Sequence, residues 1–143
     1  MTRQEKWDRR FLDDAQHIST RSKDPSTKVG AVIVDTDLSI ISQGYNGFAR
    51  GVEDTEERLN DRAVKYDLVV HGEVNAILFA RRDLRGTTLY TWPFMPCVRC
   101  ASIVVQAGIK RVVSVKNDNP RWVASFKLTE MVFREAGVEL VLY

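Results

Sequence analysis

Two short stretches decide the fold of this chain: His71-Gly72-Glu73-Val74-Asn75-Ala76-Ile77 and Pro96-Cys97-Val98-Arg99-Cys100. Together they supply an imidazole, two thiols and a carboxylate. Imidazole and thiolate are ligands that zinc prefers, and both cysteines of the chain fall in the second stretch. A structural zinc site normally has four protein ligands, whereas a catalytic one keeps a position open. His71, Cys97 and Cys100 therefore predict a zinc site with one open position.

The spacing predicts that both stretches open helices. Cys97 and Cys100 stand three residues apart, which places them on one face of a first turn if residues 96–107 are helical. A helix start also favours thiolate over thiol. His71 likewise opens an apolar stretch with helical spacing. Two helix starts are expected to converge on one metal ion.

Glu73 lies two residues after His71, so on a helix its carboxylate points sideways from the imidazole and need not bind the metal. A His-x-Glu followed by Pro-Cys-x-x-Cys is the signature of zinc-dependent nucleobase deamination. In that chemistry Glu73 takes a proton from the water that zinc activates, and then passes protons to the ring nitrogen and the departing amine.

Each half of the pattern is weak evidence by itself. Cys-x-x-Cys also occurs in structural zinc sites and redox motifs, and His-x-Glu arises by chance. The other histidine, His17, falls in a predicted N-terminal helix far away in sequence, so no fourth ligand is evident. We therefore prefer the catalytic interpretation to the structural-zinc and redox alternatives.

Length and composition predict one domain over residues 1–143, large enough for a real core. The net charge of +2 is too small to favour nucleic acid. No opening hydrophobic run indicates a signal peptide, and no stretch approaches the ~18 apolar residues of a membrane span. Cysteines that serve a metal fit a reducing cytoplasm, which is the expected location.

Hydrophobic periodicity and turn residues predict alternating strands and helices. Helices are expected at 5–19, 71–82, 96–107 and 123–136, and strands at 29–34, 39–44, 87–91, 111–115 and 138–142. Residues 47–70 form a charged insertion, in which Asp54 and Thr55 cap one short helix. The alternation predicts an α/β fold, a three-layer α/β/α sandwich around a mixed five-stranded sheet.

Four stretches resemble the deoxycytidylate (dCMP) deaminase family of the zinc-dependent cytidine deaminase superfamily: residues 28–33, 44–47 (Gly-Tyr-Asn-Gly), 71–77 and 96–101. The zinc motif is common to the superfamily, whereas Gly-Tyr-Asn-Gly and Asn75-Ala76-Ile77 indicate the narrower family. The resemblance implies hydrolysis of dCMP to dUMP. It also implies Zn²⁺ bound by His71, Cys97 and Cys100, with Glu73 as the proton shuttle.

The resemblance extends to substrate-binding residues. Asn46 resembles an asparagine that hydrogen-bonds the sugar; the alternative is a turn residue that tolerates positive φ. Gly72 stands where the family commonly has alanine, whose backbone amide addresses the base, and glycine is expected to loosen or enlarge the pocket. Lys28 is the preferred phosphate ligand. The other candidate cations are Arg21, Lys23 and Arg50.

Some features depart from the family pattern. The insertion at 47–70 lacks the Cys or His that hold a structural zinc in many family members, so we predict one zinc ion per chain. The segment before Cys97 is longer and more aromatic. Trp92 and Phe94 are therefore candidates to stack on a base or to wall a pocket for a 5-modified cytosine, with core packing as the alternative.

The resemblance further implies a homo-oligomer and control by dCTP or dTTP near Gly-Tyr-Asn-Gly. Three other functions share the zinc motif: deamination of a 5-modified dCMP, deamination of adenosine in tRNA, and a non-catalytic zinc-stabilised binding module. The weak net charge and the lack of a basic stripe count against the tRNA substrate. In the binding module Glu73 would be incidental.

Overall fold

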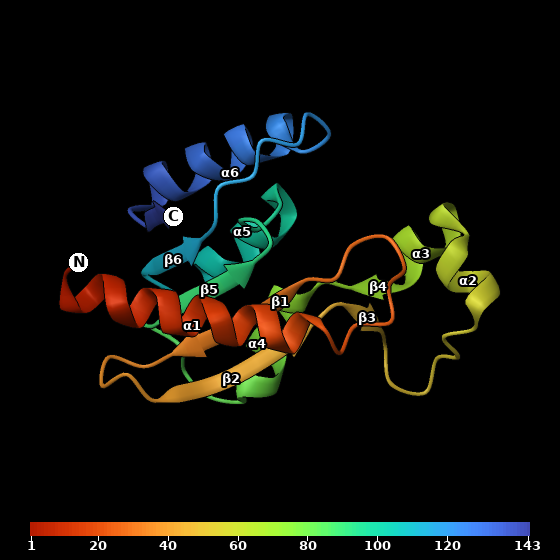
Figure 1. Ribbon diagram of the computed structural model, residues 1–143, viewed down its shortest axis with the longest axis horizontal. Helices are drawn as coiled ribbons and strands as arrows, with labels where there is room; N and C mark the ends of the chain where they lie inside the picture. Colours follow the sequence, from red (N-terminus) through yellow and green to blue (C-terminus); the bar gives the residue numbers. More distant parts are fainter.

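The computed structural model describes residues 1–143 and is built on a five-stranded sheet in the order β2-β1-β5-β6-β7 (Figure 1). β1 is antiparallel to both β2 and β5, whereas β5, β6 and β7 run parallel. The predicted mixed five-stranded sheet is confirmed. The strands are β1 (Gly30–Val34), β2 (Ile40–Tyr45), β5 (Thr88–Trp92), β6 (Arg111–Ser114) and β7 (Glu139–Leu142).

Helices cover both faces of this sheet. α1 (Arg3–Ser19) lies along one face and buries Phe11 and Leu12 there (Figure 1). The other face carries α4 (Gly72–Ala80), α5 (Val98–Gln106) and α6 (Val123–Ala136). Because side chains alternate along a strand, neighbouring residues of β1 enter different layers. The three-layer α/β/α sandwich is confirmed.

α1 begins two residues before the predicted start, because Thr2 caps it. The Thr2 hydroxyl accepts a hydrogen bond from the Glu5 backbone N–H at 3.1 Å, and the Glu5 carboxylate accepts one from the Thr2 N–H at 3.1 Å. This reciprocal pair is a capping box, which satisfies two backbone donors at once.

The insertion differs from the single helix that the sequence predicts. It contains two helices, α2 (Glu56–Asn60) and α3 (Arg62–Leu68). The strand before them, β3 (Gly47–Phe48), pairs with the strand after them, β4 (Val69–Val70), in a small antiparallel sheet. Asp61 divides the helices, because its backbone leaves the helical region and its carboxylate accepts from the first N–H groups of α3. The predicted single helix is therefore wrong.

The predicted caps of that insertion helix have different outcomes. Thr55 caps α2, with its hydroxyl accepting from the Arg58 N–H at 3.2 Å. Asp54 takes no part in the cap and instead pairs with Lys23 at 2.9 Å.

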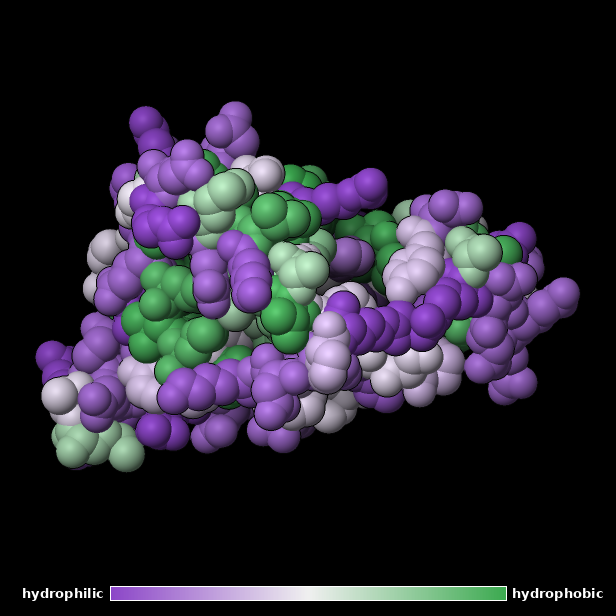
Figure 2. All heavy atoms as spheres, turned by 90° about the horizontal axis from the view of Figure 1, so that it is seen from above, coloured by the Kyte–Doolittle hydropathy of each residue, from purple (hydrophilic) through white to green (hydrophobic).

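The surface seen from above, the side on which α6 lies in Figure 1, mixes hydrophobic residues with hydrophilic ones (Figure 2). Exposed large apolar side chains of α6 are Val123, Leu128 and Met131. No helix of the fold combines the length and the apolar character that a bilayer span needs.

A buried carboxylate joins α1 to β5, β6 and the C-terminal residue. Asp8, 0% exposed, accepts two hydrogen bonds from the Arg111 guanidinium, at 2.8 and 2.6 Å. It also accepts from the hydroxyl groups of Tyr90 at 2.7 Å and Tyr143 at 2.6 Å. Burial acts to raise the pKa of Asp8, but these donors, Arg111 foremost, outweigh burial and hold the pKa below its ordinary value.

Asp8→Asn is expected to lower the free energy of unfolding by about 3 kcal/mol at pH 7, because the Arg111 guanidinium loses its buried counter-charge. A carboxyl group with a lowered native pKa stabilises the fold above its unfolded pKa of about 3.9, and this contribution disappears as pH falls through the native pKa. Urea unfolding at pH 7 and at lower pH measures the difference between wild type and variant, which should shrink in acid. Asp13→Asn, exposed on the same helix, is the control; an equal loss in both variants would contradict the assignment.

Candidate active site

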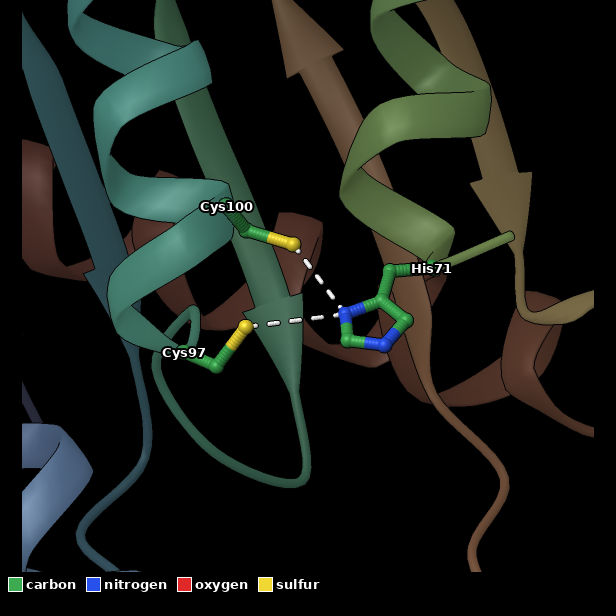
Figure 3. A group of neighbouring side chains, drawn as sticks. All are labelled: His71, Cys97 and Cys100. Atoms are coloured by element: carbon green, nitrogen blue, oxygen red, sulfur yellow. Dashed lines mark hydrogen bonds between the residues drawn. The ribbon is translucent and has the colours of Figure 1, made fainter. Parts of the chain in front are cut away.

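The three predicted metal ligands meet at the starts of two helices. His71 is the N-cap residue of α4 and Cys97 is the N-cap residue of α5, while Cys100 lies in the first turn of α5. The His71 Nδ1 atom lies 3.1 Å from the Cys100 Sγ and 3.6 Å from the Cys97 Sγ (Figure 3). All three ligand atoms lie within 4.8 Å of one another. The predicted convergence of two helix starts is confirmed, although Cys97 stands just before the first turn and not within it.

This donor set fits zinc. One ring nitrogen and two sulfur atoms are soft ligands, and three of them leave a tetrahedral ion one position for water or substrate. Neither N-cap side chain makes a capping hydrogen bond to its own helix. Both side chains turn towards the common centre instead.

The electrostatics of the two cysteines favour a thiolate at Cys97. A hydrogen bond with Cys100, supported by His71 and opposed by burial, lowers the pKa of Cys97 to about 4. The same hydrogen bond, together with burial, raises the pKa of Cys100. The hydrogen bond to Cys97 raises the pKa of His71. A cation that binds here meets one thiolate already formed and displaces the proton of the second thiol.

Glu73 lies in the first turn of α4 and is only 4% exposed. Burial raises the pKa of Glu73, while the neighbouring His71 acts to lower it. Its carboxylate is not among the three ligand atoms that converge. A buried carboxyl group that borders the same cavity as His71 and Cys97 is suited to take up and return protons.

The cavity above these groups has an aromatic wall and a polar one. Phe94 packs against Trp122 and Phe126, with ring centroids 5.4 and 5.6 Å apart. Trp92 does not line the cavity and packs in the layer of α1, so the core alternative holds for it. The polar lining residues are Asp24, Ser26, Thr27, Asn46, Arg62, Lys65, Tyr66 and Arg121.

Asn46 lines the cavity and is buried. Its Oδ1 accepts from the Val29 N–H at 2.9 Å, and its Nδ2 donates to the Thr27 carbonyl at 2.9 Å. It does not adopt positive φ, so the alternative of a left-handed turn residue is wrong. Its carboxamide holds the segment that leads into β1.

Gly72 also lines the cavity. A Cβ added there would lie 3.3 Å from the Val29 carbonyl oxygen and 3.4 Å from the Tyr45 Cα. An alanine methyl group would thus need a shift of only a few tenths of an ångström in the neighbouring backbone, so the predicted effect of Gly72 on the pocket stays a prediction.

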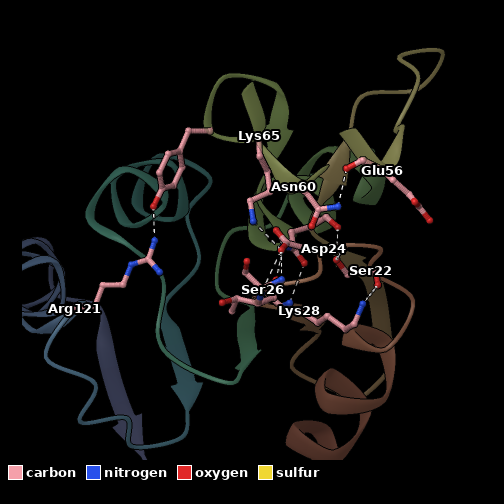
Figure 4. Close-up of polar contacts among 12 residues, drawn as sticks. Ser22, Asp24, Ser26, Lys28, Glu56, Asn60, Lys65 and Arg121 are labelled. Carbon is pink, nitrogen blue, oxygen red and sulfur yellow. Dashed lines mark hydrogen bonds and ion pairs between the residues drawn. The ribbon is translucent and has the colours of Figure 1, made fainter. Parts of the chain in front are cut away.

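Lys28 does not reach the cavity. Its exposed side chain donates to the Ser22 carbonyl (Figure 4), whereas Thr27 and Val29 on either side of it line the cavity. The side chain of Lys28 is thus directed to the Ser22 carbonyl and does not line the cavity. The structure does not bring this predicted phosphate ligand to the site.

The other predicted cations lie elsewhere too. Arg21 and Lys23 line a neighbouring cavity, and the Arg50 guanidinium lies 4.8 Å from the Phe79 ring centroid. The sequence pattern missed Arg62, Tyr66, Arg121 and Trp122, because no local motif marks them.

Comparison with known proteins agrees with this geometry. The family model for the cytidine and deoxycytidylate deaminase zinc-binding region matches residues 5–116. The uncharacterized deaminase in the luxG 3' region of Aliivibrio fischeri is 40% identical over 138 residues, covering 94% of this chain and 92% of that protein. The deoxycytidylate deaminase of Mus musculus is 38% identical over 143 residues, covering 90% and 79%.

The fold also matches a solved structure. The crystal structure of dCMP deaminase from the cyanophage S-TIM5, in complex with dCMP and dUMP, has a TM-score of 0.76 at 24% identity and covers 100% of this chain and 99% of that one. Fold, ligand set and sequence matches thus agree on one class of protein. The chain belongs to the cytidine and deoxycytidylate deaminase family of zinc-binding deaminases.

Proposed function

We propose that this protein hydrolyses dCMP to dUMP with release of ammonia, using one Zn²⁺ bound by His71, Cys97 and Cys100. The observation that carries the proposal is the convergence of these ligands beside the buried Glu73 in one cavity. The substrate is supported by the name of the mouse relative and by the dCMP and dUMP bound to the cyanophage enzyme.

In this proposal the metal, when bound, supplies a Lewis acid that activates water. Glu73 accepts the proton of the water at its carboxylate and returns it to the ring nitrogen of cytosine. The water oxygen is then bonded to the ring carbon that carries the amine. Glu73 takes the second proton from this hydroxyl group and delivers it to the amine as the C–N bond breaks, so one carboxyl group serves as base and as acid. Its burial keeps bulk water away from these transfers.

The remaining lining groups position the substrate. The aromatic wall of Phe94 and Trp122 packs against the base. The backbone N–H of Gly72 donates a hydrogen bond to the base. The carboxamide oxygen of Asn46 accepts one hydrogen bond from the protein and has a second lone pair for a sugar hydroxyl.

Further proposals concern the surroundings of the site. Exposed apolar side chains on the two helices that start at the metal ligands support a homo-oligomer: Leu78 and Phe79 of α4 and Ile103 of α5. A neighbouring cavity beside Gly-Tyr-Asn-Gly, lined by Arg21 and Lys23, supports control by dCTP or dTTP. The thiolate chemistry of the site supports a reducing cytoplasm, and residues 1–143 are proposed to act as one domain.

Ammonia release by the zinc-loaded protein tests the function. We expect kcat/KM for dCMP to exceed that for deoxycytidine by about tenfold or more, since a lost charged contact alone costs that much. CMP keeps the phosphate and differs only by its 2'-hydroxyl group, so it tests the choice of sugar. Parallel reactions with 5-methyl-dCMP test the modified base, and an adenosine-containing tRNA stem-loop tests the nucleic-acid alternative. A Cys97→Ala/Cys100→Ala double variant controls for contaminating deaminase. Turnover of the stem-loop with silence on every mononucleotide would overturn the substrate assignment.

A further inference from the structure

Three cationic side chains line the active-site cavity: Arg62 and Lys65 from α3, and Arg121 from the loop before α6. The charge of Lys65 is already balanced, because its Nζ lies 3.0 Å from a carboxylate oxygen of Asp24 and both side chains are largely buried (Figure 4). Neither arginine forms an ion pair with a carboxylate. The two arginines are the cavity cations whose charge is available to an anionic ligand.

Tyr66 connects the two arginines. The Arg121 Nη2 donates to the Tyr66 hydroxyl at 2.6 Å across 55 residues of sequence (Figure 4), and the Arg62 guanidinium lies 6.0 Å from the Tyr66 ring centroid. The Arg121 guanidinium also lies 4.8 Å from the Trp122 ring centroid. Tyr66 is a neutral partner, so it fixes the position of Arg121 without cancelling its charge. A guanidinium has five N–H donors, so most of them are left for a ligand.

The catalytic carboxyl group and the two arginines differ in how deeply they are buried. Glu73 is 4% exposed, whereas Arg62, Tyr66 and Arg121 are exposed. A nucleotide whose base reaches Glu73 therefore directs its other end towards the exposed arginines. That end of a nucleoside monophosphate is a phosphate dianion, and arginine matches phosphate oxygens with paired, charge-assisted hydrogen bonds.

We propose that Arg62 and Arg121, joined through Tyr66, bind the 5'-phosphate of the substrate and make the enzyme select a nucleoside monophosphate over a nucleoside. This inference rests on the proposed deamination of dCMP. It replaces Lys28, which does not line the cavity, as the phosphate ligand. Tyr66 is a positioning residue that acts through Arg121.

The test compares dCMP with deoxycytidine in the Arg62→Gln and Arg121→Gln variants and in the double variant. Each single change is expected to lower kcat/KM for dCMP by about 10- to 100-fold, mainly through KM, because a charge-assisted hydrogen bond is lost. The values for deoxycytidine should stay within about twofold, since it has no phosphate to lose. Tyr66→Phe should raise KM for dCMP by a smaller factor and leave kcat unchanged. Arg134→Gln, an exposed arginine of α6 outside the cavity, is the matched control.

The outcomes separate the two proposals. If the wild type does not prefer dCMP, the proposed function fails. If the wild type prefers dCMP and both arginine variants keep that preference, the phosphate assignment is overturned while the function stands. A selective loss in Lys28→Gln would also overturn it. Should a glutamine variant fold poorly, calorimetry on Arg121→Lys and the wild type with dUMP and with deoxyuridine gives the same comparison. A loss of affinity for dUMP alone supports the proposal, and an affinity for dUMP equal to that of the wild type overturns it.

Discussion

Replacing Glu73 with Gln is expected to lower kcat for dCMP by about 10³-fold while one zinc ion per chain stays bound. The amide has nearly the same shape as the carboxylate but cannot take up a proton from water or return one to the base. Because Glu73 is buried and stands apart from the three converging ligand atoms, the substitution leaves the metal ligands in place. Steady-state ammonia release gives kcat, and metal analysis of the same sample gives the zinc content.

Glu135→Gln, exposed at the end of α6, is the control for loss of one carboxylate. Thermal unfolding shows whether either variant has lost its fold. Unchanged turnover by Glu73→Gln with zinc still bound would remove Glu73 from the chemistry. Absence of turnover in the zinc-loaded wild type as well would favour the non-catalytic binding module.

The predictable parts of this protein are those that short-range patterns specify. A His-x-Glu and a Pro-Cys-x-x-Cys supply the whole ligand set within two helix starts, so the converging cluster could be expected before the tertiary structure was known. The mixed five-stranded sheet follows from alternating strands and helices, whereas the order of its strands comes from the structure. The prediction of a single helix in the insertion is wrong for an equally local reason. Aspartate is more favourable as an N-cap than inside a helix, so Asp61 ends one helix and begins the next.

The proposed phosphate ligands, Arg62 and Arg121, could not be predicted in this way, because their position depends on segments distant in sequence. Arg121 gains its place from the hydroxyl of Tyr66, a residue in the insertion, and no pattern within one segment reports that contact. Lys28 does not reach the cavity, because its side chain is directed to the Ser22 carbonyl, a contact that the local sequence pattern does not report. The sequence shows which cationic residues lie near a motif, but the fold decides which of them line the cavity.

Replacing Cys100 with Ala is expected to reduce bound zinc from one ion per chain to a small fraction and to abolish detectable deamination. Two remaining protein ligands are fewer than the three or four that zinc sites use. The buried Cys100 side chain also ties α5 to α4, since its Sγ lies 3.1 Å from the His71 Nδ1 and neither helix start has a side-chain cap. Stability should therefore fall together with activity, by about 5–10 °C in Tm.

Treating the wild type with a chelator should reproduce this result, because it removes the metal and leaves the thiols intact. Ser102→Ala, exposed on the same helix, controls for a change in α5 itself and should keep zinc, activity and Tm. Adding zinc back should restore the chelated wild type but not Cys100→Ala. The apolar core on both faces of the sheet contains no metal ligand except Cys100 at its edge, so the variant should stay folded and its loss of activity can be attributed to the site. Full zinc content in Cys100→Ala would contradict the assignment of Cys100 as a ligand, whatever happened to the rate.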